Sequence, residues 1–250
     1  METQAPAAAK SSGLSTVVNT IASPSEAFET LRTAPTWGWA LIIAIVLMFI
    51  GAYLQGPATR HAGVTQAQQM MATSSFFAAL TPAQKQQAIA RAGQPSPWPY
   101  VGLIVVLFIA VFFNALILLI GNAVGRGQAD FKRLWAGSMN IAVPTFGLGS
   151  VVLGIITMLR GPDAFNSNLD VVRAMPSLAY LAPHVSAATG AFLASISVFT
   201  LWGLFLNATM LRVTGRTSAG AAYGFAALVT LIGALFAAGG VAMLHNFGMG

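Results

Sequence analysis

The sequence predicts an all-α, polytopic membrane protein with five transmembrane helices plus short interfacial and extracytoplasmic helices. First, the 250-residue chain is 56% hydrophobic and only 7% charged, whereas a soluble domain carries about 25% charged residues. Second, the apolar residues gather into five long runs, and most charged residues lie between these runs. Lipid offers no partner for backbone N–H and C=O groups, so long apolar runs in hydrocarbon become helices.

The five predicted spans follow one another along the chain. The first covers about 37–54, has no charge inside, and carries Trp37, Trp39 and Tyr53 near its ends. Aromatic residues in these places are typical of the two membrane interfaces. The other spans are long enough to cross a bilayer with some tilt, and they cover about 99–122, 134–159, 186–211 and 220–244.

Short helices are predicted outside the spans. The stretches Ser23-Pro24-Ser25-Glu26 and Thr81-Pro82-Ala83-Gln84 each place a hydroxyl at the cap, proline at the first helical position, and Glu or Gln at the third. This capping-box pattern satisfies N–H groups that a helix start otherwise leaves unpaired. It predicts an interfacial helix over about 24–34 and an extracytoplasmic helix over about 82–92. A weaker pattern predicts a third helix over about 168–175.

The chain is expected to divide into a short tail and one membrane domain. Residues 1–36 form a cytoplasmic tail, expected to be disordered up to about Val17 and to end in the interfacial helix. The apolar side of that helix, with Phe28 and Leu31, is expected to lie in the membrane surface. Residues 37–245 form the five-span domain. No cleavable signal peptide is recognisable, so the first span is expected to serve as the targeting signal.

Lysine and arginine predict the orientation, because basic residues are enriched in cytoplasmic loops. With five spans, the tail and two tight connections place seven basic residues on one side, and the other side holds five. The two tight connections are also denser in basic residues than the longer loops. We therefore predict a multi-pass protein of the cell membrane, more specifically a bacterial inner membrane, with a cytoplasmic N-terminus and an extracytoplasmic C-terminus.

Several classes of function find no support in the residues. The chain has no cysteine, which excludes disulfides and thiolate metal sites. His61, His184 and His245 lie on different segments without the i, i+4 pairing of a helical metal site, so no metal is expected. Phosphate-cradling loops and a GxSxG elbow are missing, so neither a cofactor nor an enzyme is expected. The net charge of +6 is spread over six hydrophilic segments, which argues against nucleic acid as a partner.

Uncharged polar residues lie within the predicted spans, which carry no charged residue. Asn114 lies in the second span, Asn140 and Pro144 in the third, and Asn207 in the fourth. Hydrogen bonds between helices, worth about 0.6–2 kcal/mol each, are the common use of such groups. The alternative is a polar groove that binds a lipid headgroup or a partner. Pro144 removes the hydrogen bond to Asn140 and predicts a kink, which is either static or a hinge.

Five basic residues belong to the two tight connections and form a predicted lipid or partner face: Arg126, Lys132, Arg133, Arg212 and Arg216. Each is worth about 1 kcal/mol near an anionic membrane surface. Plain positive-inside anchoring is the alternative and the more common explanation. The connections Val124-Gly125-Arg126-Gly127 and Thr214-Gly215-Arg216-Thr217 match in their glycine and arginine. The match indicates either an internal repeat or the convergence of two tight hairpins.

Several stretches between about 21 and 245 follow the arrangement of a known membrane protein family. They are Pro24 to Phe28 with Ala34-Pro35-Thr36-Trp37, then Thr81-Pro82-Ala83-Gln84-Lys85 in a glutamine-rich loop, and Phe131-Lys132-Arg133-Leu134-Trp135 followed by Asn140 and Pro144. On these stretches the chain resembles the Yip family of Rab-interacting membrane proteins, in its prokaryotic form.

The resemblance implies five spans and a cytoplasmic N-terminus. Eukaryotic members are implicated in Rab binding and vesicle traffic. The Asp-Leu-Tyr-Gly-Pro-like and Tyr-Gly-Tyr-like signatures of the eukaryotic branch are not found in this chain, which argues against Rab binding here. The resemblance therefore supports fold and topology more than function.

Taken together, the sequence favours a non-enzymatic membrane protein of the Yip-like type that organises membrane partners or lipids. Its expected partners are the lipid bilayer and either anionic lipid or another membrane protein. One rival is a transporter or channel with a polar path near Asn114, Asn140 and Asn207. A second rival is an accessory subunit of a larger membrane complex.

Overall fold

Helices form nearly all the regular structure of the computed structural model, which describes residues 13–182 and 184–246. These residues include no strand, and one isolated antiparallel bridge joins Ser177 to Ser197. In chain order the helices are α1 (Gly13–Ala22), α2 (Pro24–Thr33), α3 (Gly38–Thr73), η1 (Ser75–Phe77), α4 (Pro82–Ala92), α5 (Trp98–Val124), α6 (Phe131–Ala142), η2 (Val143–Leu148), α7 (Gly149–Arg160), η3 (Pro162–Ala164), α8 (Asn168–Arg173), η4 (Leu178–Leu181), α9 (Ala187–Ser195), α10 (Val198–Val213) and α11 (Ala219–Asn246).

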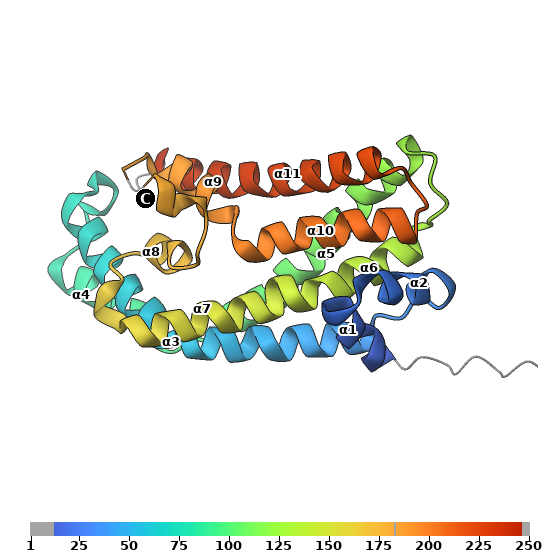
Figure 1. The fold of residues 1–250 in the computed structure, drawn as a ribbon. Helices are drawn as coiled ribbons and strands as arrows, with labels where there is room; N and C mark the ends of the chain where they lie inside the picture. The colour runs from blue at the N-terminus through green and yellow to red at the C-terminus, as the bar shows by residue number, and fades with distance from the viewer. Residues whose placement is uncertain (1–12, 183, 247–250) are drawn as a thin grey trace, which may run out of the picture.

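The long helices lie side by side along one axis, with the short helices at the two ends (Figure 1). In this view α10 and α11 lie above α3, α6 and α7, and α5 runs behind them. One end, here called the turn end, is made of α2 and the connections 125–130 and 214–218. The opposite end, here called the loop end, is made of α4, α8, η4 and α9.

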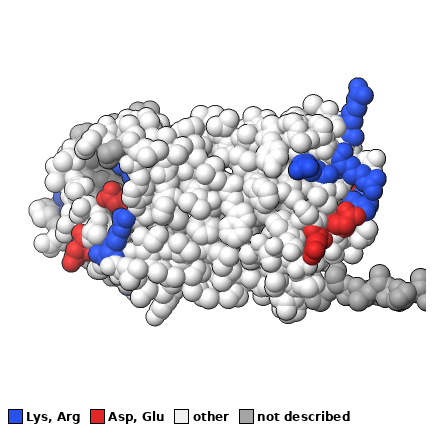
Figure 2. Space-filling view, viewed as in Figure 1, with Lys and Arg blue, Asp and Glu red and all other residues white. Residues whose placement is uncertain are grey.

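Four helical segments among the described residues are long and apolar enough to cross a membrane: Gly38–Thr73, Trp98–Val124, Phe131–Arg160 and Ala219–Met243. On the face drawn in Figure 2, the charged side chains gather at the two ends and leave the middle uncharged. A bilayer requires such an uncharged belt. The all-helical, multi-pass membrane fold is thus confirmed, whereas the count of five spans is not.

The region 186–211 contains two helices, which corrects the expectation of one continuous span. Helix α9 ends at Ser195 and α10 begins at Val198. Ser197 caps α10, because its Oγ accepts a hydrogen bond of 3.2 Å from the N–H of Thr200. With 16 residues, α10 is about 24 Å long, which is shorter than the roughly 30 Å of bilayer hydrocarbon.

The loop before α9 forms backbone hydrogen bonds to the residues on both sides of the break between α9 and α10. The N–H of Leu178 donates to the carbonyl of Ile196 over 3.2 Å, and the N–H of Val198 donates to the carbonyl of Pro176 over 3.4 Å. These bonds pair backbone groups that the helix ends leave unsatisfied. Irregular backbone inside a membrane protein is stable where other protein segments supply such partners.

The helix around Pro144 is irregular in another way than the break before α10. The chain stays helical from Phe131 to Arg160, and residues Val143–Leu148 form a π-turn. Proline has no N–H to offer the carbonyl of Asn140, and the N–H of Val143 donates to that carbonyl. The Thr145 hydroxyl also donates to the carbonyl of Ile141 over 2.8 Å.

Helix α3 is much longer than the predicted span 37–54. It continues through Pro57 to Thr73 and has 36 residues, or about 54 Å. Its second half is polar in sequence, but Ala58 and Ala62 are buried against Phe165 and its neighbours at the loop end. Tertiary packing therefore keeps this half helical beyond the predicted end.

The tail differs from the sequence prediction in its first helix and in its contacts. Residues 13–22 form α1 and bury Val17, which corrects the expectation of disorder up to that residue. The earlier part of the predicted disordered tail, residues 1–12, lies outside the described residues. Helix α2 forms close to the predicted place, but Phe28 and Leu31 are fully buried in the protein core. Its apolar side therefore contacts protein and not lipid.

Two capping boxes were expected, and the structure contains the second of them. Thr81 accepts a hydrogen bond from the N–H of Gln84 over 3.3 Å, and the Gln84 side chain accepts one from the N–H of Thr81 over 2.9 Å. Ser23 makes no side-chain cap bond to α2. Its N–H donates to the carbonyl of Asn19 in α1, so the end of α1 determines the conformation at this position.

Candidate functional site

The two connections of the turn end are bonded to each other. The side chain of Asn122, at the end of α5, donates to the carbonyl of Ala129 over 2.9 Å and accepts from the Ala129 N–H over 3.3 Å. The N–H of Gln128 donates to the carbonyl of Gly215 over 2.8 Å. A Cβ atom on Gly127 would overlap the Asn122 amide oxygen. The close approach of the two connections therefore requires glycine there.

Each connection holds one arginine in the left-handed backbone region. Arg126 has φ of 54° and Arg216 has φ of 56°, and they are the two residues other than glycine with positive φ in the described part of the chain. This conformation is uncommon for a residue with a Cβ atom. The sequence match between the two connections thus corresponds to a shared backbone geometry.

Arg212 and Arg216 line a cavity of about 650 Å³ at the turn end. The basic pocket, as we call it, is lined by Ser25, Phe205, Thr209, Arg212, Val213, Arg216, Thr217 and Ala219. Guanidinium groups bind phosphate or carboxylate through paired, charge-assisted hydrogen bonds. The hydroxyls of Thr209 and Thr217 donate to the carbonyls of Phe205 and Leu211, and the apolar members of the lining offer contact to a hydrocarbon chain.

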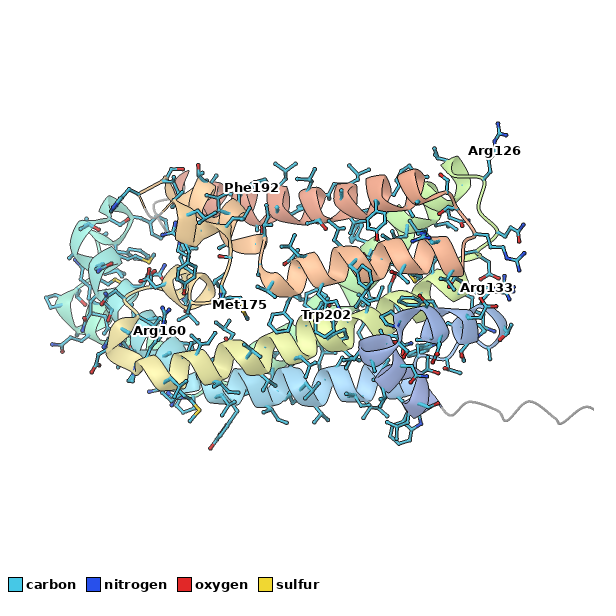
Figure 3. All side chains as sticks on the ribbon, in the orientation of Figure 1. Arg126, Arg133, Arg160, Met175, Phe192 and Trp202 are labelled. Atoms are coloured by element: carbon cyan, nitrogen blue, oxygen red, sulfur yellow. The ribbon has the colours of Figure 1, made fainter. Side chains whose placement is uncertain are left out.

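The other three residues of the predicted basic face share the turn end but do not line the basic pocket. Arg126 and Lys132 are exposed. Arg133 is engaged within the protein, because its Nε donates to the carbonyl of Arg32 over 2.7 Å and its Nη1 lies 3.4 Å from Asp130 Oδ2. Figure 3 shows Arg126 and Arg133 at the same end, opposite Arg160. Of the five residues of the predicted face, two therefore line the basic pocket, one is bonded to the tail, and two are exposed.

Three side chains of the helical bundle hold the carbonyl groups of the segment 28–36. The bonds are Thr214 Oγ1 to the carbonyl of Phe28 (3.1 Å), Arg133 Nε to that of Arg32 (2.7 Å), and Asn140 Nδ2 to that of Thr36 (2.9 Å). Phe28 and Arg32 belong to α2, four residues apart on one side of the helix, and Thr36 lies in the connection that follows it. These bonds fix α2 on the bundle and thereby place Ser25 at the basic pocket.

Acidic residues on α2 moderate the charge of the turn end. Glu29 forms an ion pair with Arg32. Hydrogen bonding from Arg32 lowers the pKa of the Glu29 carboxyl; burial opposes this effect, and the charges of Arg32 and Arg216 add to it. Glu29 is therefore ionised at neutral pH and has Arg32 as its principal partner. Arg216 is near enough to act on Glu29 by its charge alone.

Two of the three asparagines predicted to form a polar cluster lie together. Asn114 of α5 and Asn207 of α10 exchange hydrogen bonds of 3.1 and 3.2 Å through their amide groups. Asn114 also donates to the Ser138 hydroxyl of α6 over 2.7 Å. This cluster joins three helices, as expected for polar groups that hold helices together in a membrane.

Asn140 is not part of that cluster. Its amide nitrogen donates to the carbonyls of Thr36 and Ala136, over 2.9 and 2.8 Å. Its side-chain oxygen is buried and has no hydrogen-bond partner in the described part of the protein. Pro144, four residues later, lies in the π-turn and is buried. The predicted association of Asn140 with Asn114 and Asn207 is therefore wrong, because the tail occupies the amide group of Asn140.

The sequence contained part of the signal for the basic pocket. Phe205, Thr209 and Arg212 follow one another at spacings of four and three residues, and Val213 is four residues after Thr209, so these residues share one side of α10. Ser25 carries no such signal. It reaches the pocket only because α2 folds back on α10, and this contact between distant parts of the chain is a tertiary feature.

Histidine and acidic residues do not assemble a metal site in the described residues. No group of three or more His, Asp or Glu side chains there could hold a metal ion. His61 instead contacts the carbonyl of Phe165, with its Nδ1 at 3.0 Å, and its Nε2 lies 3.5 Å from Asp163. These contacts tie α3 to the loop after α7.

Comparison with protein families places the chain beside a known domain. The Yip1 domain matches residues 18–240, which include both connections of the turn end, the basic pocket and the Asn114–Asn207 pair. We found no match among curated proteins and none among solved structures. The match confirms the resemblance that the sequence indicated over nearly the same residues.

Proposed function

Because the chain belongs to the Yip1 family of membrane proteins, we propose that it is a non-enzymatic, multi-pass protein that binds anionic lipid headgroups through the basic pocket. The observation that carries the proposal is the position of Arg212 and Arg216 on one cavity with apolar neighbours. A protein that gathers anionic lipid at one end organises the membrane around it, and this is the role that we assign to the chain.

The place of the basic pocket relative to the spans supports a lipid as its ligand. Ala219, which lines the pocket, is the first residue of the candidate span Ala219–Met243. This position supports a place for the pocket at a membrane boundary, at the depth of lipid headgroups. Phe205 is 45% exposed and lies on the same lining. It offers an apolar surface to the first carbons of an acyl chain while the arginines bind the phosphate.

We further propose that the turn end faces the cytoplasm of a bacterial cell. The count of charges does not separate the two ends, because the described residues on the turn-end side include six basic and three acidic residues and those on the other side five and two. Density favours the turn end, where five of the six basic residues lie in or beside the two short connections.

The orientation can be tested with single cysteines, since the chain has none of its own. An impermeant maleimide applied to intact cells should label Asp163→Cys, whose side chain is 95% exposed at the loop end. It should leave Ser218→Cys unlabelled until the membrane is opened. The reverse labelling would overturn the proposed orientation.

The lipid proposal can be tested by comparing the loss of the two pocket arginines with the loss of two other basic residues at the same end. In one variant, Arg212→Gln and Arg216→Asn remove both pocket charges. In its matched control, Lys132→Gln and Arg126→Asn remove two charges outside the pocket. Asparagine is chosen at 126 and 216 because it tolerates the left-handed conformation of both sites. Each protein is titrated in non-ionic detergent with dioctanoyl phosphatidylglycerol, and binding is followed by native mass spectrometry.

The pocket variant should bind this lipid roughly thirtyfold more weakly, from about 1 kcal/mol for each charge. The matched control should bind it nearly as well as the natural chain. Equal losses in both variants would show that general positive charge is sufficient, and unchanged binding in both would contradict the proposal.

The rival functions receive less support. A polar path would need several unpaired groups in the middle of the bundle. Asn114 and Asn207 bond to each other and the Asn140 amide nitrogen bonds to the tail, which leaves the Asn140 side-chain oxygen as the unpaired atom of these three residues. The two cavities at the ends of the molecule are not lined by these residues. An accessory role in a larger complex would appear as stable co-purification of another membrane protein in mild detergent.

A further inference from the structure

A second cavity, of about 430 Å³, lies at the loop end, away from the basic pocket. It is bounded by the end of α7, by α8, by η4 and by the start of α9. Arg160, labelled in Figure 3, marks this end. Figure 2 shows acidic and basic side chains gathered there. The loop-end pocket, as we call it, is lined in its polar part by Arg160, Asn166, Asp170, Arg173 and Tyr180.

Arg173 is held in the loop-end pocket without a protein partner. Its Nε is buried and makes no hydrogen bond within the described part of the chain. Its guanidinium group lies on Gly190 of α9, where an added Cβ would be 2.6 Å from the Cζ of Arg173 and would overlap its Nη2. A buried donor without an acceptor is unfavourable. The arrangement therefore favours an acceptor from outside the chain.

Arg160 is the second guanidinium group of the same pocket. Its Nη2 donates to the hydroxyl of Tyr180 over 2.8 Å, and that hydroxyl donates to the carbonyl of Ala174 over 3.1 Å. The phenol thus fixes the position of Arg160 while using one of its N–H groups. A guanidinium carries five N–H donors, so Arg160 keeps donors for a ligand.

Asp170 does not neutralise the two arginines by direct contact. Its Oδ2 accepts hydrogen bonds from the backbone N–H groups of Asn166 (3.1 Å) and Ser167 (2.9 Å) as part of a capping box at the start of α8. No ion pair joins Asp170 to Arg160 or Arg173 in the described residues. Two positive charges and one carboxylate that is bonded to the backbone leave a net positive pocket, which suits an anion of low charge.

We propose that the loop-end pocket binds a phosphate ester through Arg160 and Arg173. Two planar guanidinium groups from different elements match the several oxygens of a phosphate better than a single planar carboxylate. Arg160 is also the last residue of the candidate span Phe131–Arg160, so the pocket lies at the membrane boundary. A phospholipid headgroup and a soluble phosphate ester share this chemistry and can both reach the site.

The test uses variants that change charge and variants that change geometry. Arg160→Gln and Arg173→Gln each remove one charge. Gly190→Ala keeps both charges and displaces the Arg173 guanidinium, whose far end can move without disturbing the backbone. The matched controls, Lys85→Gln and Arg91→Gln, change residues of α4 at the same end that do not line the pocket. All are made in the chain that already carries Arg212→Gln and Arg216→Asn, so that binding at the basic pocket does not contribute.

Binding is measured in non-ionic detergent with two probes, glycerol 3-phosphate and dioctanoyl phosphatidylglycerol. We expect each pocket variant, including Gly190→Ala, to weaken binding about tenfold. The two α4 controls should stay within about twofold of the parent. Saturable binding of glycerol 3-phosphate would identify a soluble phosphate ester as a ligand. Binding of phosphatidylglycerol without binding of glycerol 3-phosphate would identify a phospholipid headgroup as the ligand.

Two results would overturn the proposal. One is unchanged binding of both probes in Arg160→Gln, Arg173→Gln and Gly190→Ala, including the case in which the parent binds neither probe. The other is an equal loss in the α4 controls, which would assign the effect to general charge. Circular dichroism shows whether each variant folds. If Arg173→Gln does not fold, the single variants Gly190→Ala and Arg160→Gln still test the proposal. Because the basic pocket is already disabled, the result does not depend on the proposed function of the turn end.

Discussion

The regular backbone hydrogen bonding of the bundle is interrupted in two regions. One lies around Pro144 and the other around Ile196. Around Pro144 the chain stays helical through a π-turn from Val143 to Leu148. Around Ile196 there is no proline, yet α9 ends and α10 begins in a new frame. Proline most strongly disfavours a helix, yet the helix continues past Pro144. It breaks around Ile196, where no proline interrupts it.

Close packing supports the region around Pro144. Helix α7 lies directly against α3, and a Cβ on Gly51 would overlap the Oγ and the backbone of Ser150. On the same contact, a Cβ on Gly154 would lie 2.9 Å from the carbonyl oxygen of Gly51. The side chain of Gln55 adds a hydrogen bond of 3.1 Å to the carbonyl of Ser150. Helix α3 therefore aligns α7 with α6 across the π-turn.

Specific hydrogen bonds support the region around Ile196. The loop residues Pro176 and Leu178 bond to the two sides of the break, and Ser197 caps α10. Further along α10, Asn207 bonds to Asn114 of α5. The difference teaches that packing against a neighbour can carry a helix past a proline, while hydrogen bonds from a neighbouring loop and a cap stabilise the ends of two separate helices.

Gly51→Ala should give the largest effect and break the continuous region. The new methyl group would meet the backbone of Ser150, which cannot move aside as a flexible side chain can. We expect a loss of about 1–3 kcal/mol in the free energy of unfolding, as for other overpacked contacts. Unfolding in mixed micelles of dodecyl maltoside and dodecyl sulfate measures it.

The matched control for this change is Gly102→Ala. Gly102 lies in α5, and an added Cβ there meets nothing within 4 Å. Alanine favours helix over glycine by about 1 kcal/mol in water, so no loss is expected. An equal loss in both variants would show that the α3–α7 contact is not what supports the region.

Ser197→Ala should give an intermediate effect and loosen the break. The change removes the cap bond to the N–H of Thr200 in a residue that is 8% exposed. Loss of a serine cap costs about 0.5–2 kcal/mol. The same unfolding measurement applies, with Ser218→Ala as comparison, because Ser218 caps the exposed start of α11 by a longer bond of 3.4 Å. A smaller effect at 197 than at 218 would contradict the role given to the Ser197 cap.

Pro144→Ala should give the smallest effect and thereby sharpen the comparison. Alanine restores a backbone N–H but also raises the entropy of the unfolded chain, by about 0.4–1 kcal/mol in free energy. Because α3 holds α7 in place, we expect a net change within about 1 kcal/mol of zero. Hydrogen exchange of the amides from 143 to 148 would show whether the π-turn persists. A loss as large as that of Gly51→Ala would mean that the proline ring itself supports the continuous region.

Particular residues show how far sequence reasoning reached. The capping box at Thr81 was predicted and is present, whereas the one at Ser23 is missing because α1 ends directly before it. Arg212 and Arg216 were assigned to one basic face and do share a pocket. Arg133 was assigned to the same face but bonds to the carbonyl of Arg32. Its partner is 101 positions away, and no local pattern identifies such a contact.

The sequence by itself determined the class of the protein and its uncharged belt. Its low charge and long apolar runs leave helices in a membrane as the available solution, since lipid cannot pair backbone groups. Only the tertiary structure decided where those helices are interrupted, which arginines meet at a pocket, and where the tail lies. These outcomes depend on contacts such as Ser177 with Ser197 and Thr214 with Phe28. They join distant parts of the chain, and residue patterns within one helix carry no information about them.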